Sequence, residues 1–243
     1  MPRMPVAGVP AVRPGATMPP HPVVGPRIAI ILDDWGNNRS LLKAAVDIHE
    51  PITLSVLPNL IHSREIADEA FQNHLGVMLH MPMEPKSKKE RLEPHTIMTT
   101  TPDAEIASTL DAALQSVPHA EGVNNHMGSA ATCDARVMKV FLSRLKEKGL
   151  FFVDSNTIKE TVGPKIAKEL GIPFAKRDIF IDNDPKKNSV EKQLLKAEVI
   201  ALKMGFVVVI GHDKKATLEA LKEMAPAIEK AGVRFVLVKE LLE

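Results

Sequence analysis

The stretch Ile28-Ala29-Ile30-Ile31-Leu32-Asp33-Asp34-Trp35-Gly36 joins a continuous aliphatic run to two adjacent carboxylates. Short, continuous runs rich in β-branched residues are typical of strands that are buried on both faces, as in parallel sheets. Further runs of this kind occupy residues 52–57, 75–79, 122–123, 150–153, 179–181, 206–210 and 233–238. Together with residues 28–32, they predict eight strands.

Segments of helical length lie between these runs, with apolar residues spaced near 3.6. They cover residues 38–49, 62–74, 102–116, 134–148, 160–171, 188–204 and 215–231. Such alternation of strand and helix predicts an α/β fold. We favour a barrel of seven to eight parallel strands, because polar residues follow nearly every strand. The alternative, an open doubly wound sheet, would concentrate its site near one switch point.

The first 26 residues differ in composition from the rest of the chain. They hold eight of the nineteen prolines and no acidic residue, which predicts a proline-rich disordered linker or tail. We therefore expect a single folded domain over residues 27–243. No stretch approaches the roughly 20 apolar residues of a membrane span, so the chain itself is expected to be soluble. A linker at its start suggests a trimmed upstream anchor or signal, and hence a periplasmic or cell-envelope location.

Composition and missing motifs exclude several classes of function. The net charge of +1 argues against a nucleic-acid partner that is bound through its phosphates. A single cysteine, Cys133, cannot form an internal disulfide. The chain also lacks the signatures of P-loops, Rossmann folds, α/β-hydrolases and zincin metalloproteases. The remaining candidates are carboxylates and imidazoles at the ends of predicted strands.

Three of these residues form a predicted metal-binding set. Asp34 follows the first strand, His80 follows the third, and His126 follows the fourth. One carboxylate and two imidazoles suit a catalytic zinc site with open coordination positions, although manganese, iron, cobalt and nickel accept the same ligands. We expect a divalent transition metal, with zinc as the first choice. Asp33, which points in a different direction from its neighbour, is available to handle a proton.

Supporting or substrate-contacting roles are predicted for Trp35, Glu84, Asn125, Asp154, Arg177 and Asp182. Glu84 is either a spare base or a solvated loop residue, and Asp154 is expected to hold a histidine or Arg177 in place. Arg177 and Asp182 either orient one another or contact a sugar hydroxyl. Trp35 is either a platform that stacks on a sugar or part of the core.

Five motifs in order resemble the divergent polysaccharide deacetylase family over residues 27–243. They are Ile31-Leu-Asp-Asp-Trp-Gly36, His80-Met-Pro-Met-Glu-Pro85, Gly122-Val-Asn-Asn-His-Met-Gly-Ser129, Asp154-Ser-Asn-Thr157 and Ile210-Gly-His212. The resemblance implies a distorted (β/α) barrel and metal-dependent removal of N- or O-acetyl groups from an oligo- or polysaccharide. It further implies that Asp33 is the catalytic base, that Asp34 is a metal ligand and that His212 protonates the leaving group.

The chain departs from the broader superfamily in one respect. That superfamily supplies both metal-binding histidines from one H-x-x-x-H segment, which this chain lacks. Two alternatives to a carbohydrate deacetylase therefore stay open: a catalytically inactive barrel that binds a glycan or a protein partner, and another metal hydrolase such as an amidase or a phosphoesterase.

Overall fold

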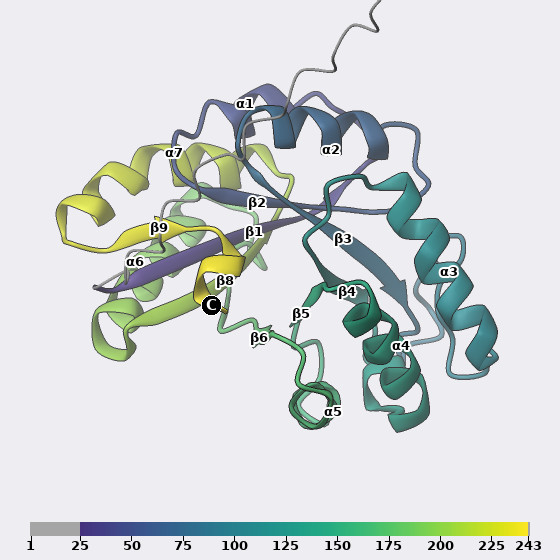
Figure 1. Cartoon of the computed structure of the whole chain (residues 1–243). Helices are drawn as coiled ribbons and strands as arrows, with labels where there is room; N and C mark the ends of the chain where they lie inside the picture. Colours follow the sequence, from purple (N-terminus) through teal and green to yellow (C-terminus); the bar gives the residue numbers. More distant parts are fainter. Residues whose placement is uncertain (1–24, 243) are drawn as a thin grey trace, which may run out of the picture.

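The computed structural model describes residues 25–242, so the predicted proline-rich tail falls almost entirely outside the described residues. The described strands form one nine-stranded sheet in which every recorded strand pair is parallel. Their bounds are β1 Arg27–Trp35, β2 Ile52–Val56, β3 Gly76–Met83, β4 Gly122–Met127, β5 Phe151–Asp154, β6 Phe174–Lys176, β7 Ile179–Phe180, β8 Phe206–His212 and β9 Arg234–Val236. The order is β6-β5-β4-β3-β2-β1-β8-β7, with β9 paired to β1, and Figure 1 shows β1 crossing the centre.

Strand β1 is buried on both faces. Ile30 pairs with Ile52 of β2 on one side and with Val209 of β8 on the other. Ile30 belongs to the large apolar cluster between sheet and helices, whereas its neighbour Ile31 belongs to a smaller cluster that includes residues of β1, β3, β5, β8 and β9. Because successive side chains of a strand point to opposite faces, a strand with apolar contacts on both sides reads as a continuous aliphatic run.

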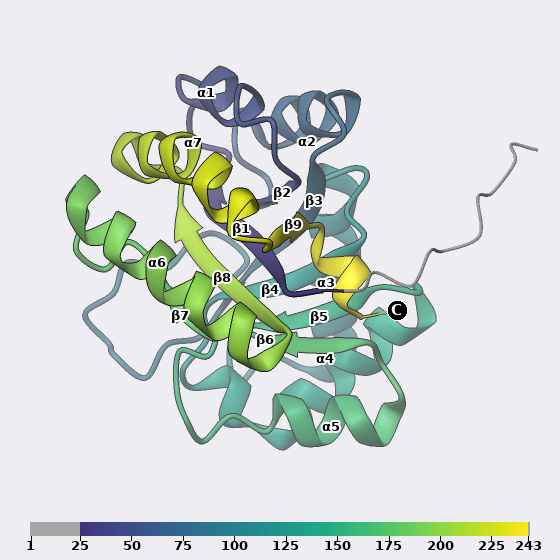
Figure 2. The same cartoon turned by 90° about the vertical axis from the view of Figure 1, so that its left-hand side faces the viewer.

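Helices alternate with the strands and lie around the outside of the sheet, as Figure 2 shows. Their bounds are α1 Leu42–Val46, α2 Ser63–Gln72, α3 Asp103–Ser116, α4 Ala135–Glu147, α5 Gly163–Leu170, α6 Lys187–Met204 and α7 Lys215–Lys230. Two short 3₁₀ helices are η1 Ala131–Cys133 and η2 Val238–Leu241. None of the helices in the described part of the chain is both long and apolar enough to span a membrane.

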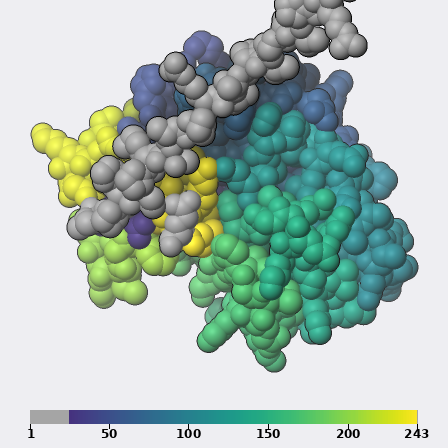
Figure 3. Space-filling model, in the orientation of Figure 1, coloured from purple at the N-terminus to yellow at the C-terminus, as the bar shows by residue number. Residues whose placement is uncertain are grey.

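The sheet curls into a half-barrel, which confirms the predicted α/β barrel class. Strands β6 and β7 lie at the two ends of the order, and no pairing joins them within residues 25–242. Val238 of η2 belongs to the smaller apolar cluster that contains Ile31, and Leu241 packs against that cluster. The 3₁₀ helix η2 also contacts β1. Figure 3 shows the yellow C-terminal segment beside the green and teal parts of the chain. Asp33, His126 and His212 lie near the carboxyl ends of β1, β4 and β8.

Several sequence-based boundaries were wrong, and the strand predicted over residues 75–79 continues to Met83 as β3. The fourth strand, predicted over residues 122–123, extends to Met127, and the short strand β6 was not predicted. The helix predicted over residues 38–49 is a five-residue helix between turns. The missed residues of β4 and β6 are polar or half-exposed, so they carry no apolar run for pattern analysis to detect.

Candidate active site

The carboxyl ends of β1, β3, β4 and β8 surround a cavity of about 370 Å³. Its lining includes all five residues that were predicted as metal ligands or catalytic groups. The lining residues are Asp33, Asp34, His80, Asn125, His126, Met127, Ser155, Thr157, Arg177, Phe180, Asn183, Ile210 and His212. The fold thus brings together residues that are up to 179 positions apart in the sequence (212 − 33).

A backbone irregularity allows two consecutive carboxylates to face this cavity. In a regular strand, Asp33 and Asp34 would point to opposite faces of the sheet. The register of β1 against β2 shifts between Leu32 and Trp35, and Asp34 takes a left-handed backbone conformation with φ of 68°. Such a bulge redirects side chains, and here it places both Asp33 and Asp34 in the cavity lining.

Asp34, His80 and His126 form a compact triangle of possible metal ligands. Asp34 Oδ1 lies 3.3 Å from His80 Nε2 and 3.1 Å from His126 Nδ1, and the two nitrogens are 3.2 Å apart. A tetrahedral zinc ion with bonds of about 2.0 Å separates its ligand atoms by about 3.3 Å. The buried Asp34 Oδ1 has no partner in hydrogen-bond geometry. The three atoms therefore fit one face of a zinc coordination sphere.

The charges around His80 favour a cation at this position. Burial alone would lower the pKa of His80, but the carboxylates of Asp33 and Asp34 outweigh that effect and raise it to about 9. For Asp34 the two effects have the opposite signs. Burial would raise the pKa of Asp34, but the imidazoles of His126 and His80 hold it below its usual range. Because the same negative potential attracts a metal ion, protons and a metal compete for this triangle.

Asp33 is tied to His80 through Asn124, which sequence analysis did not single out. Asn124 Nδ2 donates to Asp33 Oδ1 over 2.9 Å, and Asn124 Oδ1 lies 2.8 Å from His80 Nδ1. Ser55 Oγ also donates to Asn124 Oδ1, over 2.6 Å. Asp33 Oδ2 lies 3.6 Å from His80 Nε2, and burial raises the pKa of Asp33. A carboxyl with a raised pKa, beside the ligand triangle, suits a general base.

His212 approaches the triangle from β8. Its Nδ1 lies 2.8 Å from Oδ1 of the fully buried Asp182, and its Nε2 lies 3.6 Å from Asp34 Oδ2. Burial would lower the pKa of His212, but Asp182 and the nearby Asp34 raise it. The Oδ2 atom of Asp182 accepts hydrogen bonds from the His212 amide and from Thr217 Oγ1. His212 is consequently held with Nε2 toward the cavity and with its protonated form favoured.

Arg177 belongs to the cavity wall and is held by backbone carbonyls. Its Nε donates to Ser155 O over 2.7 Å, its Nη2 donates to Asn156 O over 2.9 Å, and its guanidinium lies 4.8 Å from the centre of the Phe180 ring. Asp154 contacts Arg177 through its backbone oxygen, which accepts the Arg177 amide. The carboxylate of Asp154 instead accepts from Thr161 and from the Asn156 amide.

Three other predicted residues have mainly structural contacts. Trp35 is fully buried in the large apolar cluster, so the core alternative describes it and it offers no exposed ring to a sugar. Glu84 accepts two hydrogen bonds from Thr99 and pairs with Lys88, and it is absent from the described cavity lining. Asn125 lines the cavity while its amide joins β4 to the Ser155 backbone.

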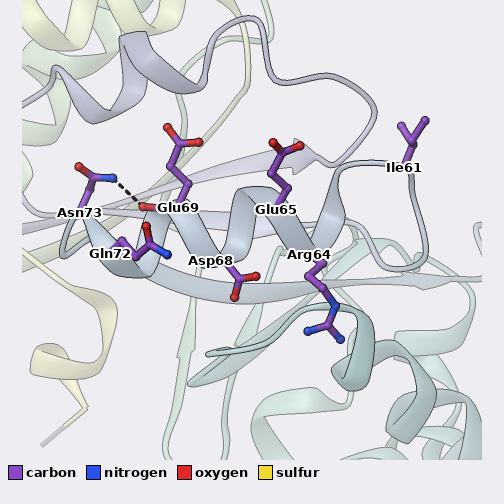
Figure 4. A pocket seen from close by; sticks show the side chains of 7 residues that line it. All are labelled: Ile61, Arg64, Glu65, Asp68, Glu69, Gln72 and Asn73. Carbon is purple, nitrogen blue, oxygen red and sulfur yellow. Dashed lines mark hydrogen bonds between the residues drawn. The ribbon is translucent and has the colours of Figure 1, made fainter.

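A larger surface hollow of about 690 Å³ lies elsewhere, along the outer side of α2. Figure 4 shows its lining, which consists of Ile61, Arg64, Glu65, Asp68, Glu69, Gln72 and Asn73. These side chains come from a single helix and its flanking residues, and several of them are paired charges such as Glu65 with Arg39. Because it is shallow and contains none of the strand-end residues, we assign the chemistry to the smaller cavity.

Comparison with known proteins gives one family. The family model described as divergent polysaccharide deacetylase matches residues 30–242. The uncharacterized protein YibQ of Escherichia coli K12 is 32% identical over 203 residues, which cover 84% of this chain and 63% of YibQ. The chain thus spans less than two thirds of the length of this relative.

Solved structures share the fold at low sequence identity. An uncharacterized protein from Agrobacterium tumefaciens C58 superposes with a TM-score of 0.87 at 20% identity, over 92% of both chains. A mutant of a CE4 family pseudoenzyme from Bacillus anthracis, with restored enzymatic activity, gives a TM-score of 0.55 at 17% identity. That match covers 92% of this chain and 69% of the other. At such identities these likenesses show the fold alone.

Proposed function

The chain belongs to the divergent polysaccharide deacetylase family, and on that premise we propose that it is a metal-dependent hydrolase that removes N- or O-acetyl groups from a carbohydrate. The observation that carries this proposal is the triangle of Asp34, His80 and His126. It shares one cavity with a buried carboxylate, Asp33, and a carboxylate-held imidazole, His212. Metal-assisted acetyl hydrolysis combines these three parts: a metal position, a base and an acid.

Asp34 and the two histidines hold the metal in this proposal. When bound, the metal supplies Lewis-acid polarisation of the acetyl carbonyl and a water of lowered pKa. Asp33 would act as the base that accepts a proton from the attacking water, since its Oδ2 lies 3.6 Å from His80 Nε2, one of the atoms that would hold the metal. His212 Nε2, on the adjacent strand, gives a proton to the departing amine or alcohol oxygen. Asp182 stabilises the charged imidazole that this step requires.

The cavity composition supports a sugar substrate with acetyl groups. Polar groups of Ser155, Thr157 and Asn183 and the apolar side chains of Met127 and Phe180 line it together. Mixed linings of this kind bind amphipathic small groups through a few oriented hydrogen bonds and apolar contacts. An acetylated sugar ring presents both hydroxyl groups and a methyl group.

Elemental analysis of the purified, tag-free protein tests this proposal first, together with the His126→Ala variant. We expect about one equivalent of zinc or another transition metal in the unaltered protein and a clear loss in the variant. His49→Ala, which removes an exposed histidine outside the cavity, is the matched control and should retain the metal. A metal-loaded protein should then release acetate from acetylated oligosaccharides.

A catalytically inactive barrel is the second candidate. It is favoured by the origin of the two histidines on separate strands, β3 and β4, and one protein of similar fold carries the description of a CE4 family pseudoenzyme. No metal after reconstitution, together with binding of a glycan, would establish this function in place of hydrolysis. Metal binding with turnover only of amides or phosphoesters would instead indicate a different metal hydrolase.

A further inference from the structure

Asn124 contacts both a proposed metal ligand and the proposed base. Its side chain is fully buried, and it joins His80 of the ligand triangle to Asp33, the proposed base. We propose that Asn124 is a positioning residue that sets the ring tautomer of His80 and leaves one oxygen of Asp33 free for proton transfer. This inference rests on the proposed function of the site, and its first half requires only metal binding.

The first half follows from the hydrogen-bonding capacity of the amide oxygen. Asn124 Oδ1 can only accept, and it lies 2.8 Å from His80 Nδ1. His80 Nδ1 therefore carries a proton and donates it. In a neutral imidazole with a proton on Nδ1, Nε2 has the lone pair, and Nε2 is the atom that faces Asp34 and His126. Partners of this kind orient metal-binding histidines and increase their basicity.

The second half follows from the amide nitrogen. Asn124 Nδ2 can only donate, and it donates to Asp33 Oδ1 over 2.9 Å. An ionised carboxylate accepts at both oxygens, so this bond occupies Oδ1 and leaves Oδ2 turned toward the ligand triangle, 3.6 Å from His80 Nε2. Asn124 thereby fixes which oxygen of Asp33 receives a proton.

The carboxylate of Asp33 determines which way round the amide of Asn124 sits, because an ionised carboxylate only accepts hydrogen bonds and must face the donating Nδ2. Asn124 Oδ1 then accepts from the Ser55 hydroxyl over 2.6 Å in a fully buried contact. A flipped amide would set its oxygen against the carboxylate of Asp33. The strand register supports this arrangement, because Asn124 of β4 pairs with His80 of β3.

Few side chains could replace this amide. A carboxylate of the same shape would still accept from His80 and Ser55, but it would repel Asp33. An apolar side chain of similar size would satisfy neither neighbour. Asn124→Asp and Asn124→Leu therefore separate the two halves of the proposal, and Ser55→Ala serves as the control because it leaves the contacts of Asn124 with His80 and Asp33 in place.

The experiment measures zinc affinity by competition with a chromophoric chelator, together with the rate of acetate release. Asn124→Asp should bind zinc at least as tightly as the unaltered protein, because an added carboxylate increases the basicity of His80. Its turnover should fall by about 100-fold or more, as expected for the loss of a general base. Asn124→Leu should weaken zinc binding by roughly 10–100-fold. Ser55→Ala should change both quantities by less than Asn124→Leu does.

A further variant tests the contact with Asp33 without metal or substrate. Asn124→Asp places two buried carboxylates side by side, which should lower the midpoint of denaturant unfolding of the metal-free protein. Adding Asp33→Asn exchanges the positions of the amide and the carboxylate, so that one side chain again donates a hydrogen bond to the other. The double variant should therefore recover most of the lost midpoint, and no recovery would overturn the second half of the proposal.

The first half is overturned if Asn124→Asp loses zinc as severely as Asn124→Leu. Should Asn124→Leu fail to fold, nitrogen-15 NMR of the unaltered, zinc-loaded protein decides the matter, because it must show a proton on Nδ1 of His80. If the unaltered protein binds zinc but deacetylates no sugar, the proposed function fails while the tautomer of His80 remains testable. The two failures are thus distinguishable.

Discussion

At the scale of single residues, Asp34 contributes both a charge and an unusual backbone conformation, and two substitutions separate these contributions. The left-handed region at φ of 68° is tolerated best by Asn, Asp and Gly, whereas other residues pay about 1–2 kcal/mol. Asp34→Asn keeps this conformation and removes the charge. Asp34→Ala removes the charge and adds strain.

We therefore expect both Asp34 variants to lose the metal, and Asp34→Ala to be the less stable of the two by about 1 kcal/mol. Elemental analysis checks the first expectation, and urea unfolding of the metal-free variants checks the second. Equal unfolding free energies would mean that this bend in β1 carries no strain. Retention of the metal in Asp34→Asn would remove Asp34 from the ligand set.

The pair formed by Asp182 and His212 gives a second prediction at this scale. Asp182 is fully buried, and its oxygens accept from the ring and the amide of His212. Asp182→Asn can present a donor to His212 Nδ1 and so favour the wrong tautomer, which costs orders of magnitude in comparable histidine–carboxylate pairs. Turnover should fall by at least about 10-fold while metal content stays unchanged, because neither residue belongs to the ligand triangle. Loss of metal in step with turnover would instead make His212 a ligand.

At the scale of elements, an ion pair joins α3 to α4. Arg144 Nε donates to Asp111 Oδ1 over 3.0 Å, and Lys148 lies 2.9 Å from the same oxygen. Hydrogen bonding from Arg144 holds the pKa of Asp111 below its usual value. A depressed pKa in the folded state stabilises the fold above the unfolded-state pKa of about 4 and loses that effect as the pH falls through the lower folded value.

Asp111→Asn should accordingly lower the unfolding free energy at pH 7, by no more than about 1 kcal/mol because the pair is partly exposed. The difference from the unaltered protein should shrink as the pH falls below about 4. Denaturant unfolding at several pH values measures both effects. Glu219→Gln, in the more exposed pair with Lys215, is the control and should change stability less. A difference that grows toward acid pH would contradict the assigned sign.

The elements also show where apolar sequence patterns fail to predict the structure. The predicted helices over 102–116, 134–148 and 188–204 agree with α3, α4 and α6 to within about two residues. Strands β1 and β8 were predicted to end at Leu32 and Ile210, yet they continue to Trp35 and His212. Backbone hydrogen bonding continues through polar residues, so apolar runs stop short where the site begins.

Recognition of the site from sequence has the same physical limit. Strand-end position and residue type were enough to group Asp34, His80 and His126, which the structure brings within 4.8 Å of one another. The sequence could not show which of Asn124 and Asn125 lies beside His80. Neighbouring residues of a strand face opposite ways, and the sequence does not reveal which of the two faces His80. Only the register of β3 against β4 shows that Asn124 lies beside His80. The roles of these residues in catalysis stay predictions.

At the scale of the whole molecule, the open seam of the half-barrel is the weakest part of the sheet. Strand β6 has three residues and β7 has two, and each lies at an end of the strand order. Arg177 and Asp178 connect them: the Arg177 amide donates to Asp154 of β5, and the Asp178 amide donates to Val208 of β8. Short edge strands open locally at low free energy, so the seam should open without unfolding of the whole domain.

Hydrogen exchange should therefore divide the sheet into two classes. Amides in the centre of β1 and β8 should exchange only through global unfolding, whereas those of β6 and β7 should exchange faster through local opening.

Zinc bound by residues of β1, β3 and β4 stabilises the folded state by mass action, so it should slow exchange in the central strands and leave the seam nearly unchanged. A sugar that contacts Arg177 and Phe180, which line the cavity at the seam, should slow exchange there as well. Mass spectrometry of the metal-free, zinc-loaded and sugar-bound protein measures all three states. Equal protection of β7 and β8 in the metal-free protein would show that the half-barrel opens only as a unit.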